Sequence, residues 1–165
     1  MNMIHRALPV LAITALLGLA AACAGSRALN PDRLVYLECA QQTGTPLDQK
    51  QIGPAGGFLD GSDNSFVIPG KALKAPANFT MSRLGGSHVG VEIVGTPPPQ
   101  ALAREATVSI SFAHCTPAEV GDTARWTIAR FPNLSAPGKK LETGSTGNVL
   151  WGYTDHNSVF VIVAD

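Results

Sequence analysis

From Gly56 to Leu73 the sequence reads Gly-Gly-Phe-Leu-Asp-Gly-Ser-Asp-Asn-Ser-Phe-Val-Ile-Pro-Gly-Lys-Ala-Leu, and this stretch decides the fold. A glycine pair opens it, an apolar run follows at Phe66–Ile68, and Pro69-Gly70 ends that run. Glycine accepts positive φ without steric cost, and proline cannot continue a hydrogen-bonded ladder. The stretch therefore predicts a strand, a turn, a second strand and a sharp turn, at the start of an all-β domain.

Outside this stretch, strands are predicted wherever apolar and polar residues alternate. The expected strands are Leu34–Cys39, Ser65–Ile68, Asn78–Arg83, Val89–Val94, Thr107–Cys115, Ala124–Phe131, Lys139–Thr143, Asn148–Tyr153 and Ser158–Ala164. We expect the last two to form a closing pair, with Val159–Val163 covered on both faces because every residue in it is apolar. Gln41–Pro54 shows no period and predicts a loop. No segment after residue 23 keeps helical periodicity for three turns, so a single antiparallel β-sandwich is expected.

Composition agrees with a strand-rich domain. Only 15% of the 165 residues are charged, against about 25% in typical domains, while 17 glycines and 12 prolines favour turns. Twelve basic residues balance 12 acidic ones. Nucleic-acid binding requires a basic face, so we expect no nucleic-acid partner. The length fits one domain, and we expect a monomer without a cofactor.

The N-terminus has the layout of a secretory signal. Met1–Ala22 has a weakly basic start, an apolar run and small residues before Cys23. The apolar run is too short to span a bilayer comfortably. Leu19–Cys23 resembles a bacterial lipobox, which implies lipid on Cys23 and a membrane tether; the alternative is an ordinary signal peptide cut before Cys23. Ala24 is not the aspartate that retains such proteins in the inner membrane, so we expect an outer-membrane lipoprotein facing the periplasm or the surface, or otherwise a secreted protein.

These features divide the chain into a signal peptide (1–22), a tether (23–33) and one β-sandwich domain (34–165). If Cys23 carries lipid, Cys39 and Cys115 remain as a pair in an oxidising compartment, and we expect them to form a disulfide. The alternative is a metal site that uses Cys115 and the adjacent His114. No second ligand pair stands at zinc spacing, so no metal site is expected.

Four motifs carry a resemblance to a known family: Gly56-Gly57, Val67-Ile68-Pro69, Ala72-Leu73 and the strand Asn78–Ser82. Together they resemble the ZU-five domain, which is a β-sandwich of ankyrins, netrin receptors and zonula occludens proteins. It is closer to bacterial secreted relatives, in which a late strand ends in cysteine, as Val108–Cys115 does here. Lys71 stands where the family has glycine. The resemblance covers about Cys39–Cys115 and implies an immunoglobulin-like sandwich that acts as an interaction or scaffolding module.

We expect no enzyme, because no catalytic constellation is present: the Gly-x-Ser-x-Gly elbow of hydrolases is missing. The leading hypothesis is a lipid-anchored, non-catalytic structural or protein-interaction module of the cell envelope. The rival hypothesis is implied by the resemblance. Some ZU-five relatives cut their own backbone at His-Phe-Ser, and here His156-Asn157-Ser158 would place a cut before Ser158.

Two further patterns have alternative interpretations. Asp60, Asp63 and Asn64 could suggest calcium, but the ordered calcium-loop series is incomplete and a hairpin turn explains them more simply. Trp126, Trp151 and Tyr153 lie on predicted strands, the last two at alternating positions of one strand. They are either core residues or an exposed patch for a glycan or a protein partner.

Overall fold

The computed structural model describes residues 28–97 and 101–165. The predicted signal peptide 1–22, Cys23 and the first residues of the predicted tether lie outside this part of the chain. The described part is mostly antiparallel β-structure with a single four-residue α-helix, α1 (Pro117–Val120), and two short 3-10 turns. Within these residues no helix has the length and apolar character needed to cross a membrane.

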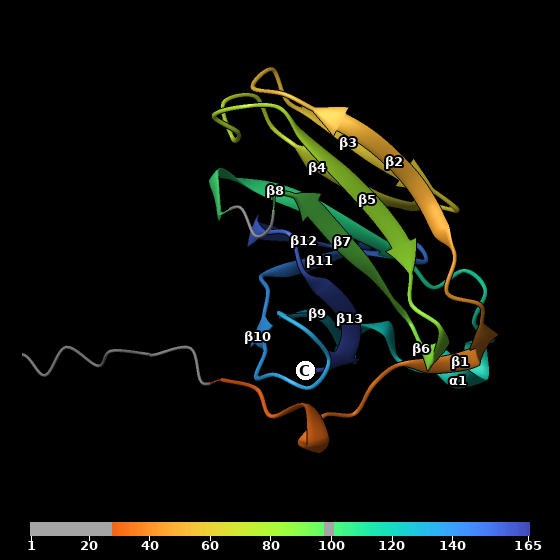
Figure 1. Cartoon of the computed structure of the whole chain (residues 1–165). Helices are drawn as coiled ribbons and strands as arrows, with labels where there is room; N and C mark the ends of the chain where they lie inside the picture. The colour runs from red at the N-terminus through yellow and green to blue at the C-terminus, as the bar shows by residue number, and fades with distance from the viewer. Residues whose placement is uncertain (1–27, 98–100) are drawn as a thin grey trace, which may run out of the picture.

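Two sheets pack face to face, as Figure 1 shows. In order, the six-stranded sheet contains β10 (Lys139–Lys140), β9 (Trp126–Phe131), β13 (Val159–Ala164), β7 (Gly90–Thr96), β5 (Ala77–Arg83) and β2 (Pro46–Ile52). The five-stranded sheet contains β11 (Thr143–Thr146), β12 (Val149–His156), β8 (Ala101–Ser111), β4 (Asn64–Ile68) and β3 (Gly57–Gly61). A small pair, β1 (Glu38–Gln42) and β6 (Gly86–His88), stands apart from both. The expectation of an all-β, antiparallel two-layer domain is confirmed.

The main core lies between the two sheets and is built from the inward residues of each strand. Phe66 of β4 and Phe160 of β13 are both fully buried, and their ring centroids lie 6.3 Å apart across the layers. Phe79 and Met81 of β5 are equally buried, as their alternation predicts. Burial of such side chains is the main favourable term in folding.

The prediction that the last two strands form a pair is wrong. β12 pairs with β11 and β8, whereas β13 pairs with β9 and β7 in the other sheet. Asn157 and Ser158 therefore carry the chain from one layer to the other. The prediction for Val159–Val163 is confirmed, because all five residues are buried.

The prediction of a loop over Gln41–Pro54 is also wrong, because β2 occupies Pro46–Ile52. β2 is an edge strand that pairs only with β5, and most of its side chains are exposed. A strand that buries little carries polar residues on both faces, so no apolar period marks it in the sequence. Pro46 is its first residue, a position where the missing N–H is tolerated.

The stretch Gly56–Leu73 forms the predicted hairpin of β3 and β4. Ser62 and Asp63 occupy its turn with φ of 49° and 63°, the signature of a type I′ turn. Gly56 has φ of 85°, and a Cβ on it would lie 2.6 Å from the carbonyl oxygen of Ile68. Only glycine fits there, because both the backbone angle and the close approach exclude a side chain.

Lys71 has a φ of 67°, a backbone conformation that favours glycine. Its N–H donates to the carbonyl of Pro54 at 2.7 Å, which holds the sharp turn against the start of the hairpin. Lysine here bears a conformational cost that glycine would avoid.

Replacing Lys71 with glycine is expected to raise the free energy of unfolding by about 1 kcal/mol, since a non-glycine residue with this φ costs about 1–2 kcal/mol. The urea midpoint of the purified domain would measure the gain. Lys74→Gly is the matched control: Lys74 is exposed and is not among the described residues with positive φ, so glycine there should not stabilise. Equal effects of both substitutions would contradict the prediction.

The predicted disulfide is present. Cys39 of β1 and Cys115, which follows β8, are bonded with their Cα atoms 5.2 Å apart. The bond ties the N-terminal part of the domain to the five-stranded sheet. A disulfide of this kind is typical of an oxidising compartment outside the cytosol.

Candidate functional site

The two sheets differ in how their outer faces are covered. On the six-stranded sheet, Val159, Val161 and Val163 of β13 form a second small core with Leu34 and Tyr36 from the segment that precedes β1. Backbone bonds hold this segment in place, including those from Leu37 N–H to the Ile162 carbonyl and from Ala164 N–H to the Val35 carbonyl. The N-terminal segment therefore covers the outer face of one sheet. No described segment covers the five-stranded sheet in this way.

An apolar row crosses the outer face of the five-stranded sheet. The strand registers place Tyr153 of β12 opposite Thr107 of β8, Thr107 opposite Val67 of β4, and Val67 opposite Phe58 of β3. Tyr153, Val67 and Phe58 are 43%, 43% and 52% exposed, although each is a large hydrophobic residue. Single exposed apolar residues are ordinary, but a continuous row marks an interaction surface.

A second row runs beside the first and is largely hydroxylic. Trp151 of β12 lies opposite Ser109 of β8, and Ser109 lies opposite Ser65 of β4, which faces Asp60 of β3. The Trp151 ring rests on the edge strand β11, because a Cβ on Gly144 would come within 2.3 Å of it. We call these two rows together the open face; it comprises Phe58, Asp60, Ser65, Val67, Thr107, Ser109, Trp151 and Tyr153.

The aromatic end of the open face is ordered. Trp151 and Tyr153 form an edge-to-face pair with ring centroids 5.6 Å apart. Such pairs are stabilised by about 0.5–1.5 kcal/mol beyond their area burial, so the two rings hold each other in place. Trp151 is half-buried and Tyr153 exposed, so the two rings form an exposed aromatic patch and are not part of the sandwich core.

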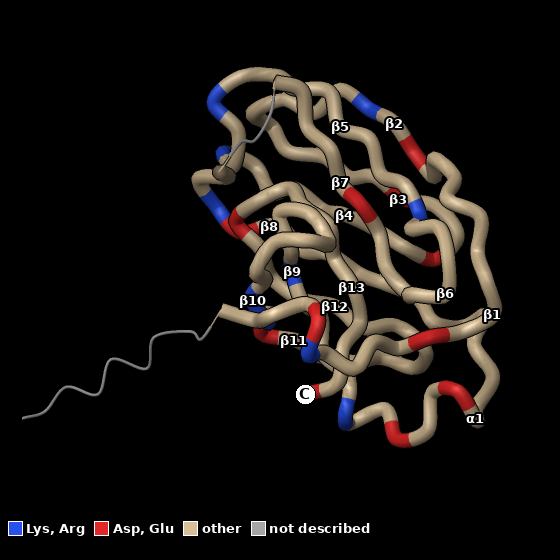
Figure 2. Tube along the Cα trace, turned by 60° about the horizontal axis from the view of Figure 1, so that its bottom comes forward, with Lys and Arg blue, Asp and Glu red and all other residues tan. Residues whose placement is uncertain are grey.

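Charged groups border the open face at its β3 end. Lys50 Nζ of β2 lies 4.6 Å from the centre of the Phe58 ring and 2.8 Å from Asp48 Oδ2. Hydrogen bonds from Lys50 and from the backbone N–H of Asp60 lower the pKa of Asp48. Elsewhere the charged residues are scattered along the chain and do not gather on one side (Figure 2).

The hydroxyl groups of the open face are available. Thr107, Ser109 and Ser65 are all half-buried on the outer side of their strands. None of the three side chains makes a hydrogen bond within residues 28–97 and 101–165. The face therefore offers donors and acceptors next to aromatic rings, the combination by which ligand sites fix orientation.

The residues of the self-cleavage hypothesis lie at the crossover between the sheets. His156 ends β12, and its Nδ1 lies 2.7 Å from Asp155 Oδ1. Arg130 Nη1 contacts the same oxygen at 2.8 Å. No bond between His156 and Ser158 occurs in the described part of the chain, and the Ser158 carbonyl accepts from Ile93 N–H. A histidine that helps an acyl shift must reach the serine, so self-cleavage before Ser158 stays a prediction without geometric support.

The Asp155 cluster predicts acid sensitivity. The hydrogen bond from His156 lowers the pKa of Asp155, and the charges of His156 and Arg130 lower it further. The ionised carboxylate therefore stabilises the fold above its ordinary pKa of about 4, and this contribution is lost as the pH falls through the lowered pKa. Asp155→Asn is expected to lower the free energy of unfolding by less than about 1 kcal/mol at neutral pH, because the group is largely exposed. The variant should also lose less stability than the parent as the pH falls.

Urea midpoints of the variant and the parent, measured from pH 7 down to about pH 3, would show whether the Asp155 carboxylate stabilises the fold and loses this effect in acid. Glu92→Gln is the control, because Glu92 is exposed on β7 and forms no ion pair within the described residues. An Asp155→Asn protein that loses stability in acid as steeply as the parent would contradict the assignment.

The alternative metal site at Cys115 and His114 is close in space. The Cys39, Cys115 and His114 ligand atoms all lie within 4.8 Å of one another. Both sulfurs are bonded to each other, however, and it is the thiolate that binds metal. Desolvation beside the disulfide lowers the pKa of His114, and the positive charge of Arg83 lowers it further.

Asn64, one of the residues considered for calcium, has a structural role. Its amide nitrogen donates to the carbonyls of Gly61 and Ser62, and its oxygen accepts from Ser111 N–H. The side chain therefore shapes the hairpin turn and joins it to β8. This agrees with the simpler interpretation of the motif as a turn.

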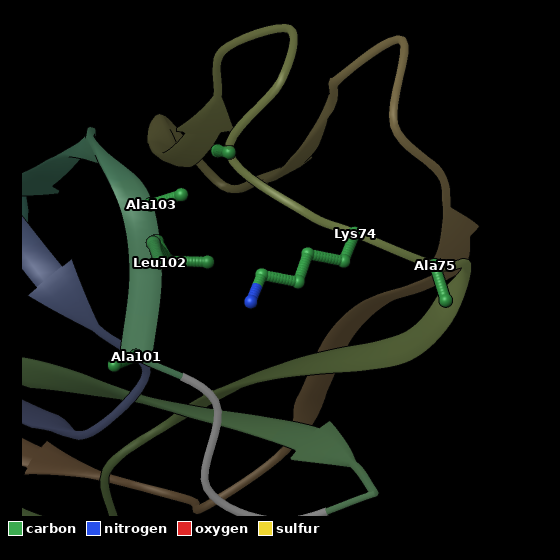
Figure 3. Close-up of a pocket in the computed structure, with 6 residues that line it drawn as sticks. Lys74, Ala75, Ala101, Leu102 and Ala103 are labelled. Atoms are coloured by element: carbon green, nitrogen blue, oxygen red, sulfur yellow. The ribbon is translucent and has the colours of Figure 1, made fainter.

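A separate pocket of about 490 Å³ opens beside the start of β8. Ala72, Lys74, Ala75, Ala101, Leu102 and Ala103 line it, and the Lys74 side chain extends into it (Figure 3). Lys74 is the one charged residue among these six, and the others contribute aliphatic side chains. Ligand sites need a few convergent polar groups, so the open face is the better candidate.

The sequence pointed to half of this site. The alternation of Trp151 and Tyr153 predicts an exposed patch as one of two interpretations, whereas no sequence pattern marks Phe58 and Val67 as part of a site. Their outward direction follows from the alternation in β3 and β4, but their alignment with Tyr153 depends on the strand order. Comparison of the sequence with models of known protein families finds no match, and comparison with curated proteins finds none either.

Proposed function

We propose that the mature chain is a non-catalytic binding module of the cell envelope, tethered to a membrane by lipid on Cys23. The open face is its contact surface. The observation that carries this proposal is the outward row Tyr153, Thr107, Val67 and Phe58, whose three large hydrophobic members are exposed, on the sheet that the N-terminal segment leaves free. The disulfide supports an address outside the cytosol.

We also propose that the domain is a bacterial secreted relative of the ZU-five, immunoglobulin-like sandwich. Support comes from the sequence pattern of the β3–β4 hairpin and from the glycine-like backbone of Lys71. The family's role as an interaction module agrees with a binding function, but the surface here is argued from its own residues, because a fold does not fix a function.

The tether is tested by replacing Cys23 with serine in the full chain expressed in a bacterium. We expect the parent protein in the membrane fraction and Cys23→Ser in the soluble envelope or the medium, because acyl chains provide the membrane affinity. The intact mass of the parent would report lipid on Cys23, two hydrogens lost to the disulfide and any cut before Ser158. A parent protein with an unmodified Cys23 and no membrane association would contradict the proposal.

A further inference from the structure

We propose that the ligand of the open face is a neutral polysaccharide. This inference rests on the proposed binding function and adds the chemical class of the ligand. It follows from the exposed aromatic rings that lie beside free hydroxyls on the open face, from the lack of charge between them, and from the length of the face.

The side chains of the face match the two surfaces of a sugar ring. A pyranose presents C–H groups on its faces and hydroxyls around its rim. Trp151, Tyr153 and Phe58 offer rings for the C–H faces, and aromatic side chains combine large contact area with little loss of conformational entropy. Ser109 and Ser65, half-buried and without partners among the described residues, can both donate to and accept from the rim hydroxyls.

The charge distribution argues for a neutral ligand. Between the aromatic ends, the face carries Thr107, Ser109, Ser65 and Val67, and none of these side chains ionises. Charged residues stand at the borders of the rows: Lys50 and Asp60 at the β3 end, and Glu105 and Asp155 next to Thr107 and Tyr153 along β8 and β12. Three of these four residues are acidic, so a polyanion would meet no complementary patch, and the rows themselves offer a charged ligand no ion-pair partner.

The dimensions argue for a chain of sugars. Tyr153 and Phe58 belong to strands three neighbours apart, with β8 and β4 between them. Strands in a sheet are about 4.8 Å apart, so the row is about 14 Å long. A row of this length contacts several consecutive units of a polymer laid across the strands. Its apolar part is only one residue wide, whereas protein interfaces typically bury about 800 Å² on each partner around an apolar centre.

Affinity electrophoresis of the mature protein tests this directly, in gels containing a neutral glucan or a neutral mannan, and in gels containing a uronic-acid polymer as the charged comparison. We expect retardation by a neutral polymer. Trp151→Ala and Phe58→Ala, at opposite ends of the face, should each weaken binding by about tenfold or more. Leu134→Ala is the control: Leu134 is 40% exposed, lies away from both rows, and should leave affinity within about twofold.

A second measurement reads the site itself. The chain has two tryptophans, and Trp126 is buried, where it donates to the Val120 carbonyl. In a Trp126→Phe background, all tryptophan emission therefore comes from Trp151. The neutral polymer should shift that emission. Retardation that survives both alanine variants, or that only the charged polymer produces, would overturn the inference.

A photo-crosslinking amino acid at Val67, used in the cell envelope, separates failure of the inference from failure of the proposed function. Crosslinking to a protein, without any neutral-polysaccharide binding, would overturn the glycan assignment and leave the binding module standing. Absence of both would overturn the two proposals together.

Discussion

Replacing both Cys39 and Cys115 with alanine is expected to lower the free energy of unfolding by about 4–5 kcal/mol. The two residues are 76 positions apart, so the bond closes a long loop and removes much of the conformational freedom of the unfolded chain. Domains of this size are stable by about 5–15 kcal/mol in total, so the variant would retain only part of its stability.

Urea unfolding of the double variant and of the parent, with and without a reducing agent, measures this effect. The reduced parent is the matched control, because it keeps both cysteine side chains and loses only the crosslink. We expect the reduced parent and the double alanine variant to unfold at similar urea concentrations. A double variant within about 1 kcal/mol of the oxidised parent would show that the crosslink constrains little.

Replacing Phe160 with alanine is expected to cost about 3–5 kcal/mol. Its ring is fully buried near the start of β13 and approaches Phe66 of the opposite sheet. Truncation loses the transfer free energy of the ring and leaves a cavity between the layers, which close-packed neighbours fill only partly. The midpoint of thermal unfolding should fall by about 10–15 °C.

Thermal scans followed by circular dichroism would check this value. Val94→Ala is the control: Val94 is 46% exposed on β7, in the same sheet, and should change stability by no more than about 0.5 kcal/mol. A Phe160→Ala protein that unfolds within a few degrees of the parent would contradict the placement of this ring in a tightly packed core.

Local chemistry explains what the sequence predicts well. The β3–β4 hairpin follows from its glycines and its polar turn, and β5 and β7 follow from clean alternation. The disulfide follows from the number of cysteines and the expected compartment. Each of these features depends on residues close in sequence or on a simple pairing rule.

The partners of β12 and β13 could not be deduced from the predicted turn Thr154–Asn157, because a short polar connection between two strands normally signals a hairpin. The burial patterns of the strands do not decide it either. β12 alternates buried and accessible residues, whereas Val159–Val163 of β13 is apolar throughout. A difference of this kind also occurs within one layer, because β13 pairs with β7, whose residues alternate between buried and exposed. The row from Tyr153 to Phe58 could not be predicted from the sequence either. Its four residues come from four strands, and their alignment depends on the order of those strands in the sheet.

The position of the disulfide has a mechanical consequence. A pull on the N-terminus would enter the described chain near Leu29, which exchanges two backbone hydrogen bonds with Gly138. Backbone hydrogen bonds of this kind can break one after another under force. At Cys39, however, the force would pass through the covalent disulfide to Cys115, which lies just past the end of β8. That strand bears Thr107 and Ser109, so tension between a membrane anchor and a captured ligand would bypass β2, β5 and β7 and leave those strands unloaded.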